Sequence, residues 1–387
     1  MNNSLKSSLS EIDDLIKKFK NQKKIKLNEA GFNNDDKKSV IDCLNTSYVS
    51  THGKKTIEFE KKLSKYLNNK KVISTINGTS ALHACLVALG VKKKHEVLLP
   101  SFNYIASANC IKYLGATPHF VEINKNDLCV CANKLEKYLV KTCKLKNNDC
   151  YNKKSGKIIK VIIVTNIFGH IADYQNLRKV CKKFKIKILE DASESLGSFY
   201  KNKPGGTFGD LGVLSFNGNK IITTGGGGAV VVNNTKYYKL VYSLITIGKK
   251  RNKILFDYER VGYNYRMPSL NAALGISQLN LLKNRVKKNN ILFRKYEKFF
   301  SNSNNFEIFK QPKNCKSNYW LQAIMLKKSN QNIRDKILKY TNKRNFETRP
   351  AWALCHKLKI FSNHKKMILS VTNKLHNQII NIPSNLK

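Results

Sequence analysis

The chain of 387 residues contains 71 Lys and Arg against 25 Asp and Glu, a formal charge of +46, and 41% of its residues are hydrophobic. This composition is typical of a globular protein with a large core and a smaller second domain, and it excludes a disordered chain. No apolar run approaches the roughly 18–20 residues of a membrane-spanning helix, and the N-terminus lacks the apolar core of a signal peptide. We therefore expect a cytoplasmic protein with no membrane partner.

The strong positive charge does not by itself indicate a nucleic-acid partner. Arg supplies only nine of the 71 basic residues, and the Lys are spread along the chain among Asn and Ile. Proteins that read nucleic acids usually cluster Arg with Lys on one face. We expect no nucleic-acid partner, but we expect the charge to favour anionic ligands.

The ten Cys show no metal-binding pattern. None forms a CxxC pair, and the closest pair is Cys129 and Cys131. Zinc sites need spaced pairs of soft ligands, so no metal site is predicted. Several Cys lie in apolar periodic stretches, which is typical of reduced core thiols.

The first predicted element is a short amphipathic helix in an N-terminal extension, residues 1–24. From residue 72, apolar runs of strand length alternate with helical patterns, which predicts a mostly parallel sheet with helices on both faces. We assign this large α/β domain to residues 25–284. The strands are expected at 72–76, 96–99, 119–123, 160–164, 186–189, 212–216 and 229–232, and the helices at 81–89, 104–114 and 173–184.

The pattern changes after about residue 285. A long helix at 285–300, a helix at 332–343 and apolar runs at 306–309, 319–326 and 379–382 predict a smaller α+β domain over 285–387. The polar, Lys/Asn-rich segment 141–157 is interpreted as a surface insertion in the large domain.

Three polar groups follow predicted strands, where ligands of parallel sheets bind. Asn77–Ser80 opens a helix whose free N–H groups attract an anion, although an ordinary helix cap is the alternative. Asp191 follows a strand and is either a fixed charge partner or a helix cap. Lys220 lies five residues after Ser215 and precedes four consecutive glycines. Together they describe a pyridoxal-phosphate site: a lysine for the Schiff base, a carboxylate for the pyridine nitrogen and donors for the phosphate.

Further segments accompany these groups, namely LPSFNYIASAN at 99–109, GATPHFVEI at 115–123, FGH at 168–170, EDASESLGS at 190–198, GTFGDLGVLSFNGNKIITTGGGGA at 206–229 and GYNYRMPSLNAALG at 262–275. With NGTSALH at 77–83, they make the sequence resemble the DegT/DnrJ/EryC1/StrS family of sugar aminotransferases. The resemblance runs from about Ile25 to the C-terminus. It implies the fold type I architecture of pyridoxal-phosphate-dependent transferases, which is aspartate aminotransferase-like.

The resemblance also implies roles for single residues. Lys220 would be the catalytic lysine that bonds to the cofactor and shuttles protons, and Asp191 the partner of the pyridinium nitrogen. Glu194 matches a position that contacts the cofactor ring or the substrate, where the family often has Gln. Tyr104 would stack on the ring. The phosphate site would comprise Gly78, Thr79, Ser80 and Ser215.

Asn264 in GYNYR matches a residue that reaches the phosphate of the neighbouring subunit, which implies a homodimer with shared active sites. His170 is more simply a hydrogen-bonded loop residue than an acid–base group, and His83 a packing residue. Arg349 would face the substrate and meet a nucleotide phosphate or the donor's carboxylate, or form a structural ion pair.

The residues around Lys220 depart from the SFHP sequence of many relatives, because Asn217 and Gly218 precede it. This resembles the legionaminic-acid-pathway branch of nonulosonic-acid biosynthesis. The expected reaction transfers an amino group from L-glutamate to a nucleotide-linked 4-keto-6-deoxy sugar. The alternatives are a relative that acts on a 3-keto sugar or a cyclitol, and a non-catalytic regulator or scaffold.

Overall fold

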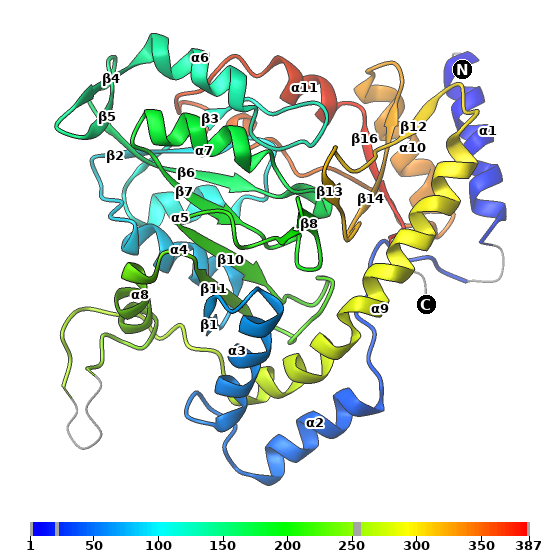
Figure 1. Ribbon diagram of the computed structural model, residues 1–387. Helices are drawn as coiled ribbons and strands as arrows, with labels where there is room; N and C mark the ends of the chain where they lie inside the picture. The colour runs from blue at the N-terminus through cyan, green and yellow to red at the C-terminus, as the bar shows by residue number, and fades with distance from the viewer. Residues whose placement is uncertain (1–2, 20–22, 251–256, 385–387) are drawn as a thin grey trace.

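A computed structural model describes residues 3–19, 23–250 and 257–384 of the chain (Figure 1). Its centre is a sheet in the order β1-β11-β10-β7-β6-β2-β3. Strands β3, β2, β6, β7 and β10 run parallel, and β11 runs antiparallel to both β10 and β1. The α/β prediction is therefore confirmed. The strands are β1 Lys71–Thr75, β2 His95–Pro100, β3 Thr117–Val121, β6 Ile158–Thr165, β7 Lys187–Asp191, β10 Leu211–Ser215 and β11 Gly228–Val232.

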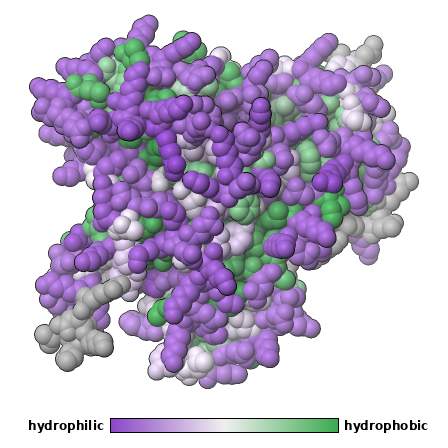
Figure 2. Space-filling view, in the orientation of Figure 1, coloured by the Kyte–Doolittle hydropathy of each residue, from purple (hydrophilic) through white to green (hydrophobic). Residues whose placement is uncertain are grey.

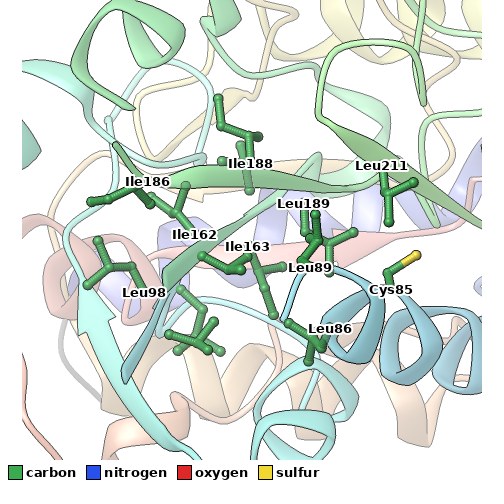
Figure 3. Close-up of a cluster of buried hydrophobic side chains, with 14 of the residues drawn as sticks. Cys85, Leu86, Leu89, Leu98, Ile162, Ile163, Ile186, Ile188, Leu189 and Leu211 are labelled. Carbon is green, nitrogen blue, oxygen red and sulfur yellow. The ribbon is translucent and has the colours of Figure 1, made fainter. Parts of the chain in front are cut away.

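Helices lie on both faces of this sheet (Figure 1). On one side are α4 Gly78–Ala88, α5 Ala106–Tyr113 and α8 Tyr238–Ile245, and on the other α6 Ala132–Thr142 and α7 Tyr174–Lys183. The core between the layers is made of aliphatic side chains such as Leu98, Ile162 and Leu189 (Figure 3). The continuous β-branched run of β6 is typical of a central parallel strand that is buried on both faces.

A second, antiparallel sheet has the order β12-β14-β16-β15. It is built from β12 Phe306–Ile308, β14 Gln322–Leu326, β16 Ile379–Ile382 and β15 Arg349–Pro350, with α10 Gln331–Lys343 and α11 Ser370–His376 beside it. A three-stranded sheet joins β13 Cys315–Lys316 to β8 Phe199–Tyr200 and β9 Lys203–Pro204. Three short 3-10 turns cover Ile167–Gly169, Thr235–Tyr237 and Cys355–Lys357.

The two main sheets are linked by α9, Ser269–Phe300, which starts before the predicted helix and runs unbroken through residue 285 (Figure 1). Helices α2 Asn34–Asn45 and α3 Lys54–Tyr66 pack against its first half. A Cβ on Gly275 would come within 2.8 Å of the Phe59 ring, so glycine permits this close helix contact. The domain boundaries at 24/25 and 284/285 stay a prediction.

The N-terminal extension forms the predicted amphipathic helix, α1 Asn3–Lys17. Ile12 and Leu15 are buried, and Leu9, Ile16 and Phe19 are partly buried against the same core. Their neighbours include Tyr296 of α9 and Ile337 of α10. The helix therefore covers the second sheet's core.

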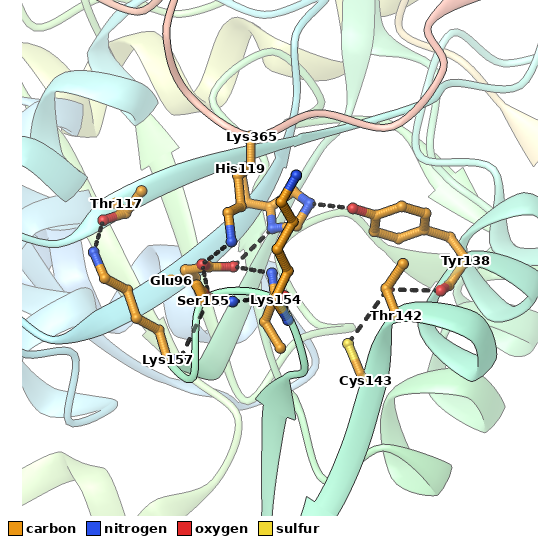
Figure 4. A network of polar contacts seen from close by, with 11 residues as sticks. Glu96, Thr117, His119, Tyr138, Thr142, Cys143, Lys154, Ser155, Lys157 and Lys365 are labelled. Carbon is orange, nitrogen blue, oxygen red and sulfur yellow. Dashed lines mark hydrogen bonds and ion pairs between the residues drawn. The ribbon is translucent and has the colours of Figure 1, made fainter.

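The polar segment 141–157 contains regular structure that the sequence interpretation missed. It forms a hairpin of β4 Cys143–Lys146 and β5 Asp149–Asn152, and β5 pairs with β6. Buried Glu96 anchors it by accepting hydrogen bonds from Asn152 and Ser155, at 2.9 and 2.6 Å (Figure 4). The segment is thus an extension of the sheet, although Lys144–Lys146 stay exposed.

Hydrophilic side chains cover most of the face shown in Figure 2, over both main sheets. This agrees with a charge spread along the chain. Among the described helices, none is both long enough and apolar enough to span a bilayer.

Candidate active site

A cavity of about 400 Å³ opens at the carboxyl ends of β7 and β10, next to the start of α4. It brings together residues from all three motifs that the sequence singled out. Of the predicted residues, Gly78, Thr79, Tyr104, Asp191, Glu194, Ser215 and Lys220 line it. Ser80 and Asn264 are not among its lining residues.

One end of the cavity is the N-terminus of α4. The Asn77 side chain caps this helix by accepting a hydrogen bond of 2.7 Å from the Ser80 backbone N–H, so this N–H is not free for a ligand. A Cβ on Gly78 would lie 3.1–3.3 Å from the Ser215 side chain, so glycine lets the helix start approach the end of β10. Free N–H groups and the hydroxyls of Thr79 and Ser215 therefore converge on a site suited to a phosphate.

Asp191 ends β7 and lies on the cavity wall with only 5% of its surface exposed. Its two oxygens accept hydrogen bonds from the Ser107 hydroxyl, at 3.0 Å, and from the Ser193 N–H, at 3.2 Å. These bonds fix the direction of the carboxylate. Such a fixed anion suits a cationic ring nitrogen.

Lys220 follows β10 in a turn that its own N–H closes on the Asn217 carbonyl. Its Nζ lies 3.5 Å from Glu194 Oε1 and 3.9 Å from the centre of the Trp320 ring. Burial raises the pKa of Glu194 to about 7, although the Lys220 charge and the Phe168 N–H oppose this shift. The cavity thus holds one amine beside a titratable carboxyl group.

Tyr104 stands at the cavity wall with 57% of its surface exposed, so one ring face is available to a ligand. Asn264 is exposed, and its backbone bridges to Thr246 rather than to a cavity residue. Within one chain, Asn264 is therefore not part of this cavity.

The two histidines lie outside the cavity lining. His170 is fully buried between the rings of Phe309 and Tyr319, its Nδ1 has no hydrogen-bond partner, and burial lowers its pKa to about 3. We expected His170 to be a hydrogen-bonded loop residue, and the structure shows its ring packed against two aromatic rings. His83 packs against Tyr263 and Tyr265, as predicted for a packing residue.

Arg349 lines a neighbouring cavity of about 560 Å³. Its guanidinium contacts Glu347 at 2.9 Å, and its side chain is 62% exposed. This second cavity shares Asn219, Trp320 and Trp352 with the first, so the two cavities lie on either side of the same residues.

Sequence reasoning missed part of the cavity wall, namely Asn77, Asn103, Ser107, Thr165, Ser193, Asn217, Asn219, Trp320 and Trp352. Asn77, Asn217 and Asn219 lie inside motifs that the sequence had singled out, so their position next to predicted site residues could have identified them. Trp320 and Trp352 come from the C-terminal part of the chain, and no local pattern connects them with the strand ends.

The DegT/DnrJ/EryC1/StrS aminotransferase family model matches residues 32–387. The chain belongs to this family. Two relatives are GDP-perosamine synthase of Vibrio cholerae, 30% identical over 92% of both chains, and UDP-4-amino-4,6-dideoxy-N-acetyl-beta-L-altrosamine transaminase of Campylobacter jejuni, 35% identical over 74% of both. The solved structure of Helicobacter pylori PseC, an aminotransferase involved in pseudoaminic acid biosynthesis, has a TM-score of 0.84 at 25% identity and covers 94% of both chains.

This DegT-family member is therefore a pyridoxal-phosphate-dependent aminotransferase with the predicted fold. Its cavity fits the cofactor chemically, because it presents helix N–H groups and hydroxyls at one end, a fixed carboxylate on the wall and an amine between them. Its volume is also within the range of small-molecule sites, roughly 300–1,000 Å³.

Proposed function

We propose that this aminotransferase passes an amino group from L-glutamate to the keto carbon of a nucleotide-linked 4-keto-6-deoxy sugar, in surface-polysaccharide or nonulosonic-acid biosynthesis. The observation that carries the proposal is a cavity that retains Lys220 and Asp191 in a chain related over nearly its full length to GDP-perosamine synthase. The second relative's name specifies a 4-amino-4,6-dideoxy sugar linked to UDP. Amination at carbon 4 of a 6-deoxy sugar is consistent with that name.

In this proposal the residues of the cavity divide the work. The cofactor supplies a ring that withdraws electrons from the substrate carbon. Lys220 would hold the cofactor and would move the substrate's proton at its Nζ, and Asp191 would supply the negative charge for the ring nitrogen. Tyr104 covers the ring. Gly78, Thr79 and Ser215 would hold the phosphate together with Asn264 of a second copy, whereas Ser80, which does not line the cavity, would take no part.

The neighbouring cavity would receive the anionic part of the substrate. Arg349 can form charge-assisted hydrogen bonds to a nucleotide phosphate or to the donor's carboxylate. Its exposure leaves donors free beyond the contact with Glu347. Trp320 and Trp352, which line both cavities, would then contact the part of the substrate between its anionic group and the reacting carbon.

Two features of the surface support a homodimer. Exposed apolar side chains gather on α2 and the turn after it, including Ile41, Leu44 and Tyr48, which are 52–66% exposed. A second copy of the chain would cover them, and Asn264 lies outside its own cavity. We also place the enzyme in the cytoplasm, because the ten cysteines are free thiols.

The test is amino transfer by purified enzyme loaded with pyridoxal phosphate. L-glutamate is combined with a panel of GDP-, UDP- and TDP-linked keto sugars, a 3-keto sugar and a cyclitol ketone, and products are identified by NMR and mass spectrometry. The proposal expects a 4-amino product from a nucleotide-linked 4-keto-6-deoxy sugar. Amination of only the 3-keto sugar or the cyclitol would support the alternative acceptors. Steeply salt-dependent DNA binding without any amino transfer would favour a regulator.

The role of Arg349 has a separate control in this assay. Arg349→Gln should raise KM for the substrate whose anion it binds and leave kcat within about twofold, because the contact is made equally before and during the reaction. The substrate whose KM changes identifies that anion. An unchanged KM for both substrates would assign Arg349 to the Glu347 ion pair alone.

A further inference from the structure

The Lys220 amine lies between two walls in the structure. On one side Glu194 Oε1 is 3.5 Å from Nζ, and on the other the Trp320 ring centre is 3.9 Å away. The Lys220 side chain is only 12% exposed, and that of Glu194 5% exposed. A carboxylate and an indole face are both attractive surroundings for an ammonium group, and burial strengthens both interactions.

Glu194 is itself held by the backbone. Its second oxygen, Oε2, accepts a hydrogen bond of 2.9 Å from the Phe168 N–H. Phe168 has φ of 56°, a left-handed conformation that a residue with a large side chain rarely adopts. The fold therefore maintains a strained residue at the point where it holds the carboxyl group, which leaves Oε1 directed at Lys220.

Trp320 is fixed to the same framework. Its indole N–H donates to the Asn219 carbonyl at 2.7 Å, immediately before Lys220 in the chain. The buried Asn318 side chain accepts a hydrogen bond of 2.8 Å from the backbone N–H of Trp320. It also donates one of 2.9 Å to the backbone carbonyl of Glu194. A single side chain thus ties the two walls together across about 124 residues of sequence.

The charge of this arrangement depends on pH. Burial raises the pKa of Glu194 to about 7, and the nearby Asp191 charge adds to the shift, whereas Lys220 and the Phe168 N–H lower it. Burial raises the pKa of the Cys129 thiol well above its ordinary value, and the Glu194 charge adds slightly to this shift, so the thiol is neutral here. Glu194 is therefore mainly a carboxylate above pH 7 and mainly neutral below it.

We propose that Glu194 and Trp320 form a seat that positions the Lys220 amine whenever that amine is not bonded to the cofactor. Under the proposed function the lysine would be unbound for part of each half-reaction, so the amine would need a defined place from which to return. Glu194 supplies the opposite charge, and Trp320 supplies a flat face that excludes water. The inference rests on the proposed function in one respect, the role of Lys220 as the cofactor lysine.

The test measures how fast Lys220 reacts with a trace amine reagent in full-length protein without cofactor, using labelled acetic anhydride and peptide mass spectrometry. Glu194→Gln keeps the side-chain size and can still accept from Phe168, but it cannot carry a charge. At pH 8.5 Lys220 should label about tenfold faster in this variant than in the wild type, because only the neutral amine reacts. At pH 5.5 the two rates should agree within about twofold, since Glu194 is then neutral in the wild type.

Equal rates at pH 8.5, or a rate ratio that is the same at both pH values, would overturn the proposal. The wild type alone provides a second readout in case the variant does not fold. Its Lys220 labelling should rise less steeply across pH 7, where Glu194 becomes charged, than at higher pH, where Glu194 stays charged throughout. A dependence of the labelling rate on pH that fits the titration of one amine alone would contradict the proposed role of Glu194.

Two further variants separate the walls from general packing. Trp320→Leu should accelerate labelling at both pH values, because the indole does not titrate, and Trp320→Phe should restore most of the protection. Glu136→Gln breaks the exposed ion pair with Lys183 and should leave Lys220 labelling unchanged. Borohydride trapping in cofactor-loaded protein tests separately whether Lys220 is the cofactor lysine, so the failures of the two proposals are distinguishable.

Discussion

Burial favours the neutral form of two titratable side chains near the cavity, and their neighbours decide whether anything opposes it. His170 is surrounded by aromatic rings, so burial lowers its pKa to about 3 and keeps the imidazole neutral. Glu194 is equally buried but faces Lys220, and its pKa is raised only to about 7. Because His170 has no access to the cavity, Lys220 is the residue to which we assign proton transfer.

Replacement of Lys220 by Ala tests this assignment. We expect kcat to fall by roughly 10³-fold or more, because both the covalent link to the cofactor and the general base are lost. The thermal midpoint should change little, since the side chain reaches into a cavity rather than into the core. The measurement is steady-state amino transfer together with a thermal melt, with Lys183→Ala as a control that keeps full activity. Retention of more than a tenth of the wild-type kcat would contradict the assignment.

At the scale of elements, the alternation of apolar runs and helical patterns predicted the sheet well. The strands of the large sheet are buried on both faces, so their β-branched runs are distinctive, as in β6. The hairpin β4–β5 was missed because its sequence is polar and its stability comes from pairing with β6 and from Glu96, not from an apolar pattern. The early start of α9 was missed because Gly275 and the mixed polarity of that stretch obscured the helical period.

The same distinction applies to the site. Strand ends predicted Lys220 and Asp191, because ligand-binding residues follow strands in parallel sheets. Ser107, which orients Asp191, and Trp320, which covers Lys220, come from other elements. Ser107 lies inside the segment at 99–109 that had been singled out, so the sequence did carry a signal for it. Trp320 reaches the cavity only in the folded arrangement, and no local pattern marks it.

The Glu96 network provides a prediction at this scale (Figure 4). Burial alone would raise the pKa of Glu96, but hydrogen bonds from His119, Ser155 and Asn152 outweigh it and lower the pKa to about 2. Since the ordinary value is 4.5, the ionised group stabilises the fold fully above about pH 4.5, and this contribution is lost as the pH falls towards 2. Glu96→Gln should therefore lower the free energy of unfolding at pH 7 by about 3 kcal/mol.

The measurement is urea unfolding of wild type and Glu96→Gln at several pH values. The difference between them should shrink steadily between pH 4.5 and pH 2. A difference that stays constant or grows on acidification would contradict the network as the source of the stability. Glu136→Gln, which removes an exposed ion pair, should show little difference at any pH.

At the scale of the whole molecule, hydrophilic side chains are distributed widely over the face that Figure 2 shows. The exposed apolar side chains on α2 and its following turn are more specific. A homodimer would bury them and would bring Asn264 of one copy to the cavity of the other.

Subunit mixing tests the shared site. Lys220→Ala and Asn264→Ala are each expected to be strongly impaired when prepared alone. After unfolding and refolding together in equal amounts, about a quarter of the wild-type activity should return, because each mixed dimer contains one site with both native residues. Sedimentation velocity would confirm the dimer. Mixed dimers that form without any recovery of activity would show that Asn264 serves its own chain or neither.

The central claim is that Lys220 in this cavity carries the cofactor and that the cofactor accepts an amino group. The most direct measurement is the visible absorption spectrum of the purified protein with pyridoxal phosphate, before and after excess L-glutamate, followed by borohydride reduction and peptide mass spectrometry. We expect a yellow absorption band that bleaches with glutamate, and a reduced cofactor covalently attached to Lys220 when borohydride is added before glutamate. A protein that stays colourless with pyridoxal phosphate, or a cofactor trapped on a different lysine, would contradict the account.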